Sequence, residues 1–272
     1  MNDTLTYLTS EEILQKEFEY YKKTPGRLSN ISQRNEIVKF FQQDSFYVFE
    51  KELWKDERTR KAIIENRCKY LNKTPEELTD NDILMGFKRS GMHYGYSHFN
   101  PLLFKWFIEK YNVKRCYDAC GGWGHRLLGA QDLELYIYND LSRHTAENVI
   151  DIADYFGITN TVFVNADARE FTPYVQFEYD AMFTCPPYFN IEEYECGLFP
   201  SYEEWAGIID VMHICFDNYK KCKVMGIVIR EDLLPDWHND YTEKFELKVH
   251  KSQHLMKDSE KKSQECLFVW ER

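Results

Sequence analysis

Four short segments of this chain combine residue types that bind nucleoside-like ligands or orient an amino group. The first, residues 117–126, has the order D-x-x-x-G-x-G, which is formed by Asp118, Gly122 and Gly124. Glycines permit a tight turn from a strand into a helix and let a ligand lie close to the backbone. The helix that follows offers free N–H groups. A packed strand–helix corner has the same composition, so the later segments decide between the two interpretations.

Two further carboxylates follow short apolar runs. Asp140 ends the run that begins at Leu135, and a carboxylate there can accept hydrogen bonds from both hydroxyls of a ribose. Asp167 and Ala168 follow the next run, where the carboxylate could bind the amine of an adenine. Taken alone, each aspartate is more typical of a turn or a helix cap. Their order along the chain, after the glycine turn, favours a cofactor site.

The fourth segment is Thr184-Cys185-Pro186-Pro187-Tyr188. Neither proline donates an N–H group, so the pair fixes a stiff turn whose carbonyl groups can accept hydrogen bonds from an amine. Tyr188 can stack on a planar ring beside that turn. An amine oriented in this way directs its nitrogen lone pair at a methyl donor. Such a transfer needs no strong base, because its rate comes mostly from positioning and electrostatics.

Alternating strands and helices would bring the four segments together. We expect strands at 114–118, 135–139, 161–165, 179–184 and 223–229, with helices at 102–111, 126–130, 145–156 and 202–219. Residues 245–249 and 265–270 are expected to form a terminal antiparallel pair. The pattern predicts an α/β fold with a doubly wound, mostly parallel sheet. Right-handed crossovers place the carboxyl ends of the strands on one edge, where ligands bind, and all four segments fall at those ends.

The first part of the chain precedes every cofactor-type segment and has helical patterns at 10–22, 30–51, 55–70 and 79–85. We expect residues 1–96 to form a helical appendage that takes part in substrate recognition, and residues 97–272 to form the main domain. The densest basic cluster consists of Arg58, Arg60, Lys61, Arg67 and Lys69. It is compatible with a solvated helix face or with phosphate contact. The basic and aromatic loop 88–96 is either a base-stacking element or a connector.

Composition limits the range of functions. The net charge is −11, so any nucleic-acid contact must use a local basic face. The eight cysteines form no C-x-x-C pair, which predicts free thiols and no metal site. The N-terminus does not resemble a signal peptide, and no apolar run has the length of a membrane span. We therefore expect a cytoplasmic location and no membrane partner; the oligomeric state is left open.

The turn 118–124 followed by the segment 184–188 resembles class I S-adenosylmethionine-dependent methyltransferases. It is similar in particular to DNA amino-methyltransferases that modify adenine N6 or cytosine N4, and the segment 183–188 to the DNA modification methylases of phages and plasmids. The resemblance covers residues 97–230 and implies a Rossmann-like methyltransferase domain at 97–272, S-adenosylmethionine as the cofactor and DNA as the partner. The target base would be flipped out of the duplex to lie against Tyr188.

The resemblance also implies a set of site residues. The segment 98–101 would line the methionine end of the cofactor, and Asp118 would contact its amino group. The implied cofactor-binding residues are His98, Phe99, Asn100, Asp118, Ala119, Cys120, Gly121, Gly122, Gly124, Asp140, Leu141, Asp167 and Ala168. The implied catalytic residues are Thr184, Cys185, Pro186, Pro187 and Tyr188.

The sequence departs from that family in two respects. Cys185 stands where most members have Asp, Asn or Ser, and a thiol is a weak acceptor. Backbone carbonyl groups or Thr184 would have to accept the amine hydrogens instead. No large recognition domain separates Tyr188 from the fifth strand, so the appendage or the loop 189–200 would select the target. Two alternatives stay open: a methyltransferase of an RNA guanine or a protein glutamine, and a non-catalytic module that binds a partner.

Overall fold

The computed structural model describes residues 5–31, 34–90, 98–189, 199–248 and 264–272. The chain divides into two compact units. We call residues 1–17 with 34–97 the helical unit, and residues 18–33 with 98–272 the sheet unit. None of the described helices is both long enough and apolar enough to span a membrane.

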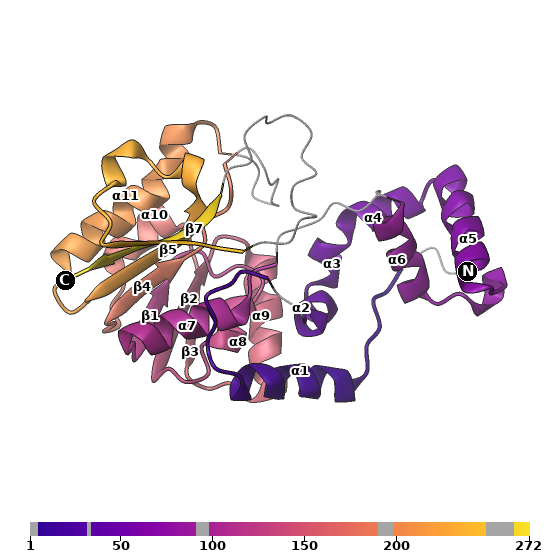
Figure 1. The fold of residues 1–272 in the computed structure, drawn as a ribbon, viewed down its shortest axis with the longest axis horizontal. Helices are drawn as coiled ribbons and strands as arrows, with labels where there is room; N and C mark the ends of the chain where they lie inside the picture. The colour runs from indigo at the N-terminus through magenta and orange to yellow at the C-terminus, as the bar shows by residue number, and fades with distance from the viewer. Residues whose placement is uncertain (1–4, 32–33, 91–97, 190–198, 249–263) are drawn as a thin grey trace. The chain divides into compact units, whose positions relative to one another are not determined.

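The sheet unit is built on a seven-stranded sheet with the strand order β3-β2-β1-β4-β5-β7-β6 (Figure 1). Strands β1 to β5 pair in parallel, whereas β7 is antiparallel to both β5 and β6. The strands are β1 Arg115–Asp118, β2 Leu135–Asp140, β3 Thr161–Asn165, β4 Ala181–Thr184, β5 Val224–Arg230, β6 Glu243–Glu246 and β7 Glu265–Glu271. This confirms the predicted fold class. The strand order reverses between β1 and β4, which is where such sheets bind ligands.

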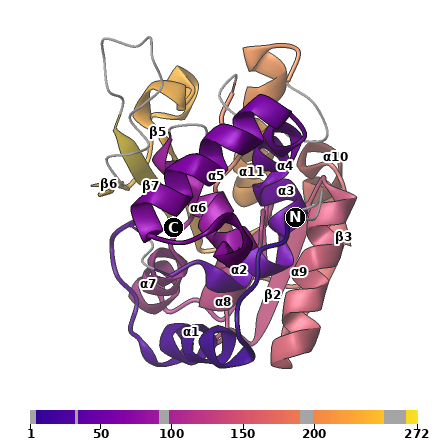
Figure 2. The same cartoon turned by 90° about the vertical axis from the view of Figure 1, so that its right-hand side faces the viewer.

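Helices cover both faces of the sheet. One face carries α7 Pro101–Tyr111, α8 His125–Gly129 and α9 Arg143–Phe156, and the other carries α10 Ala168–Phe171 and α11 Tyr202–Asn218 (Figure 1). Helix α9 runs along β2 and β3 (Figure 2). Asn100 caps α7 by accepting a hydrogen bond from the N–H of Leu102, with Pro101 in the first turn. That cap fixes where the chain enters the helix.

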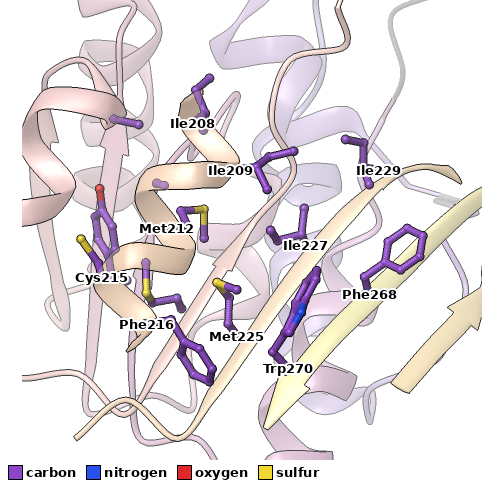
Figure 3. Packing of buried hydrophobic residues seen from close by; sticks show 14 of the residues in the cluster. Ile208, Ile209, Met212, Cys215, Phe216, Met225, Ile227, Ile229, Phe268 and Trp270 are labelled. Carbon is purple, nitrogen blue, oxygen red and sulfur yellow. The ribbon is translucent and has the colours of Figure 1, made fainter. Parts of the chain in front are cut away.

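The central strands are apolar on both faces, as is usual for parallel strands covered by helices. Phe183 of β4 packs on the α7 side, with its ring centroid 4.9 Å from the rings of both Phe104 and Phe107. Its neighbour Met182 belongs to the opposite cluster. Figure 3 shows that cluster, in which Met212 and other side chains of α11 pack against β5 and β7. Burial on both faces holds the strand ends, and hence the site, in place.

The helical unit differs from its predicted pattern. The helical pattern expected over 30–51 is divided into three short helices, α2 Glu36–Phe41, α3 Gln43–Phe46 and α4 Val48–Trp54. Gln42 and Tyr47 interrupt it with ψ angles of 20° and 19°, which lie outside the helical region. The last helix, α6 Asp80–Arg89, runs past the predicted end at residue 85 and includes the first residues of the predicted loop. Residues 91–96 of that loop lie outside the described residues.

The boundary between the units falls inside α1 Glu11–Lys23. Residues 18–33 therefore group with the sheet unit, although we placed them in the appendage 1–96. Phe18 stacks on Phe156 with ring centroids 4.3 Å apart, and the N–H of Arg27 donates to the carbonyl of Leu102 at 2.8 Å. The recognition role of the helical unit stays a prediction.

The basic cluster is smaller than its sequence indicates. Arg67, on α5 Glu57–Leu71, is buried, and its guanidinium lies over the ring of Tyr70 at 5.2 Å. It follows Ile63 by four residues, so both lie on the buried face of the helix. Arg58, Lys61 and Lys69 are exposed and remain available for a phosphate contact.

Glu17 should make stability depend on pH. Burial raises the pKa of Glu17 to about 7, and one of its oxygens accepts the N–H of Glu36 at 2.9 Å. A raised carboxyl pKa means that the folded state binds more protons, so stability is lost as the pH rises through this range. We expect a decrease on the order of 3 kcal/mol between about pH 4.5 and about pH 7.

Urea unfolding followed by far-ultraviolet circular dichroism at pH 5 and pH 7.5 measures this effect. Glu17→Gln should remove most of the dependence, whereas the exposed control Glu11→Gln should keep it. The same pH dependence in Glu17→Gln and in the wild type would contradict the assignment to Glu17.

Candidate functional site

The glycine turn and the Pro-Pro-Tyr segment meet at the switch point of the sheet. β1 and β4 are paired neighbours with Asp118 opposite Phe183, so both segments leave the same edge. The hydroxyl of Thr184, at the end of β4, accepts a hydrogen bond from the backbone N–H of Cys120 at 3.1 Å. This bond joins the two turns directly.

The glycines of the turn have different roles. Gly121 lies against the ring of Tyr138, where a Cβ atom would be only 2.1 Å from a ring carbon. Gly124 has φ = +93°, and its Cβ would face Ile152 of α9 at 3.0 Å. We expected Gly124 to leave room for a ligand, but the position that a Cβ would take at Gly124 is occupied by side chains of α9. Gly122, with φ = +62°, has the open side: the nearest atom to its Cβ would be Nη2 of Arg126, at 3.9 Å.

Asp118 forms a buried ion pair with Arg126. Oδ2 of Asp118 accepts from Nε of Arg126 at 2.5 Å and from the hydroxyl of Tyr136 at 2.6 Å. Arg126 also donates to the carbonyl of Cys120, and its guanidinium lies 5.0 Å from the ring centroid of Phe99. The other oxygen, Oδ1 of Asp118, is buried and has no hydrogen-bond partner among the described residues. It is therefore an acceptor that lacks a donor.

Asp140 shapes the glycine turn from the end of β2. Its oxygens accept the N–H of Gly122 at 2.8 Å and the N–H of Ser142 at 2.9 Å. Burial raises the pKa of Asp140. Each carboxylate oxygen can accept a second hydrogen bond, so the side chain keeps capacity for a ligand hydroxyl. Leu141 beside it is 46 % exposed.

Asp167 acts as a helix cap in this structure. Its carboxylate accepts the N–H of Arg169 at 2.8 Å and pairs with the guanidinium of the same residue at 2.5 Å. A hydrogen bond from Arg169 lowers the pKa of Asp167. An adenine amine would have to share this carboxylate with Arg169. Ala168 is buried in the first turn of α10.

The segment before α7 lies beside the glycine turn. Nδ1 of His98 is 3.1 Å from Nε2 of His125, the first residue of α8. Burial, followed by the charge of Arg126, lowers the pKa of His125 to about 3, so this imidazole is neutral at physiological pH. Phe99 and Asn100 are both buried. His98 and Phe99 are thus linked to the helix that follows the turn, through His125 and Arg126.

The Pro-Pro-Tyr turn is held from two sides. The carbonyl of Pro187 accepts the indole N–H of Trp205 at 2.6 Å, so that carbonyl is already engaged. The hydroxyl of Tyr188 donates to Oε1 of Glu265 at 2.5 Å. Cys185 is half-buried and Pro186 is buried. Most of the predicted recognition loop 189–200 lies outside the described residues.

Sequence reasoning did not find three residues that organise this site. They are Arg126, Glu265 and Asn30, whose amide donates to Glu265 at 2.9 Å. Arg126 precedes two leucines in the sequence, and that contrast is a weak signal, whereas Asn30 and Glu265 stand in polar stretches that give none. The partners of Asn30 and Glu265 are distant in the chain, so those pairs emerge only from the fold, whereas Arg126 pairs with the nearby Asp118.

No family model and no curated protein sequence matches the chain. Several solved structures are similar. The SAM-dependent methyltransferase from Agrobacterium tumefaciens is 15% identical, with a TM-score of 0.46, over 66% of this chain and 64% of that one. TrmN from Thermus thermophilus is 15% identical, with a TM-score of 0.45, over 63% of this chain and 48% of that one. An rRNA methylase from Streptococcus thermophilus is 11% identical, with a TM-score of 0.40, over 58% of this chain and 86% of that one. At these identities the likeness is limited to the fold and does not bear on the substrate.

Proposed function

We propose that the chain is an S-adenosylmethionine-dependent methyltransferase that acts on an exocyclic amino group of a DNA base, adenine N6 or cytosine N4. The observation that carries this proposal is the hydrogen bond between Thr184 and Cys120, which joins the glycine turn to the Pro-Pro-Tyr turn at the switch point. A cofactor on one turn would then lie next to an amine on the other. Open α/β sheets bind ligands at this point.

The residues of the glycine turn fit the proposed cofactor. The buried Oδ1 of Asp118 lacks a donor and could accept one from the amino group of the methionine part. Gly122 leaves open space beside the backbone. Asp140 has acceptor capacity for the ribose hydroxyls, and exposed Leu141 offers an apolar surface for a base. All of these features belong to the sheet unit.

The cofactor would supply an electrophilic methyl group. The residues of the chain would orient the acceptor: Tyr188 stacks on the flipped base, and the backbone carbonyl groups of Cys185 and Pro186 accept the amine hydrogens. The thiol of Cys185 is a weak acceptor and is not required for this. The chain contributes positioning rather than a general base. The excess proton would leave to solvent after the transfer.

Transfer of isotope-labelled methyl from S-adenosylmethionine to unmodified DNA, RNA and a protein extract tests the proposal. Label in DNA that co-migrates with N6-methyladenine or N4-methylcytosine after hydrolysis supports it. Label in RNA or in protein alone would replace the proposed substrate by one of the alternatives. No transfer to any of the three, with binding of the cofactor retained, would favour the non-catalytic module.

Asp140→Ala should weaken cofactor binding. The variant loses charge-assisted hydrogen bonds to the ribose, and we expect a cost of about 2–3 kcal/mol in binding free energy. Isothermal titration calorimetry with S-adenosylmethionine measures it. Asp151→Ala, an exposed aspartate of α9, is the matched control and should bind as the wild type does. If folded Asp140→Ala bound S-adenosylmethionine with the affinity of the wild type, Asp140 would only cap the turn and would not bind the ribose.

Charge reversal of the exposed basic cluster should weaken nucleic-acid binding. Arg58→Glu, Lys61→Glu and Lys69→Glu together remove three candidate phosphate contacts and should flatten the dependence of log K on log salt by up to about three units. Arg67 is left intact because it is buried. Fluorescence anisotropy with a labelled duplex at several salt concentrations measures the slope. An unchanged slope would show that these side chains do not contact phosphates and only form a solvated helix face.

A further inference from the structure

A buried carboxylate holds the tyrosine of the Pro-Pro-Tyr turn. Glu265 is 7 % exposed, and each of its two oxygens has one donor. Oε1 accepts from the hydroxyl of Tyr188 at 2.5 Å, and Oε2 accepts from the side-chain amide of Asn30 at 2.9 Å. Burial raises the pKa of Glu265. A carboxylate is rarely buried without a role, because burial penalises the charge.

The topology explains how Glu265 reaches this place. β7 is antiparallel to β5 and pairs its first residue, Glu265, with Arg230 at the end of β5. The first residue of β7 therefore lies at the edge where the parallel strands end. The side chain thus meets Tyr188 at the edge that also carries Asp118 and Thr184.

The orientation of Asn30 is fixed by its own contacts. Its Oδ1 accepts the backbone N–H of Asn100 at 2.8 Å, which leaves its amide nitrogen to face Glu265. Asn100 is held in turn by its bond to the carbonyl of Ser29 at 2.7 Å. Glu265 is therefore a fixed acceptor for the Tyr188 hydroxyl, because its other side is anchored to the start of α7.

We infer that Glu265 is a positioning residue: through the hydroxyl of Tyr188 it fixes the plane of the ring against which the target base stacks. This inference rests on the proposed function. A ring that is already oriented needs no reorganisation when the base arrives, and such preorganisation favours the transfer step. Stacking alone would tolerate phenylalanine at position 188, whereas positioning through the hydroxyl does not.

Kinetics of a double-mutant cycle test the inference. Glu265→Leu and Tyr188→Phe should each lower kcat/KM for the nucleic acid by about 10- to 100-fold, the usual effect of one lost charge-assisted hydrogen bond. The double variant should be no worse than the poorer single variant, because both changes remove the same contact. Glu265→Gln keeps a weaker bond and should retain more activity than Glu265→Leu. Cofactor affinity should stay within about twofold.

Glu271→Gln is the matched control, since it changes an exposed glutamate of the same strand and should leave the kinetics unchanged. Losses that multiply in the double variant would overturn the inference, because Glu265 would then act independently of the hydroxyl. Equal losses in Glu265→Gln and Glu265→Leu would overturn it as well.

A measurement without turnover separates this inference from the proposed function. With ¹³C-labelled tyrosine rings, the Tyr188 resonance is assigned by its loss in Tyr188→Phe. It should shift or broaden in Glu265→Leu and stay in place in Glu271→Gln. An unchanged resonance in Glu265→Leu overturns the positioning role even if the wild type is active. If the Tyr188 resonance changes in Glu265→Leu but the wild type methylates no substrate, the contact between Glu265 and Tyr188 is supported and only the proposed function is rejected.

Discussion

Asp118→Ala is expected to lower the free energy of unfolding of the sheet unit by about 3–5 kcal/mol. The substitution leaves the buried guanidinium of Arg126 without its carboxylate and removes the acceptor of the Tyr136 hydroxyl. An uncompensated buried charge is among the most destabilising changes a core can receive. Equilibrium unfolding in urea, followed by the fluorescence of the tryptophans, measures the change.

A second variant separates the ion pair from general damage to the turn. Asp118→Ala with Arg126→Leu removes both charges and should recover part of the loss, because two apolar side chains avoid the buried charge. Asp151→Ala on α9 is the exposed control and should change stability by less than about 0.5 kcal/mol. A loss below about 1 kcal/mol in Asp118→Ala would show that Arg126 finds another partner or reaches solvent.

Tyr188→Ala should reduce methyl transfer at least about 100-fold, more than Tyr188→Phe does, while the dissociation constant of the cofactor changes by less than about twofold. The substitution removes the ring on which the target base would stack, and it leaves the glycine turn on β1 unchanged. Steady-state transfer of labelled methyl to the substrate identified in the panel, together with calorimetry of cofactor binding, gives both quantities.

Tyr174→Ala is the matched control for this loss. Tyr174 is a tyrosine of the same unit, is 73 % exposed and is not one of the proposed site residues. Its removal should affect neither quantity. A similar decrease in both variants, or a parallel loss of cofactor affinity in Tyr188→Ala, would mean that the effect of Tyr188 is not on the target base.

The fold was predictable from the sequence because apolar runs and turn residues mark the strands clearly. Strand β3 has the predicted bounds 161–165, and β2 ends at Asp140 as expected. A parallel strand such as β2, which is buried along most of its length, reads as a continuous apolar run, so its end is easy to locate. Since the functional segments sit at those ends, the sequence also indicated which residues would share one edge.

Tertiary partners were not predictable. The bond between Tyr188 and Glu265 joins residues 77 positions apart, and the contact of Asn30 with Glu265 spans 235. Neither pair shares a helix face or a strand register that the sequence displays. The strand expected at 245–249 lies at Glu243–Glu246, because its register is set by pairing with β7. The burial of Arg67 was readable from its spacing to Ile63, but its charge suggested the surface.

The insertion of β7 between β5 and β6 has a consequence for folding during synthesis on the ribosome. β5 is apolar and buried along nearly its whole length, and among the described residues β7 is the strand that pairs with one of its edges. A nascent chain that has not yet released residues 265–271 therefore carries an open, apolar edge strand, which is the kind of surface that pairs with other chains. The same late strand delivers Glu265, so the tyrosine of the turn acquires its anchor only when this last gap in the sheet is closed.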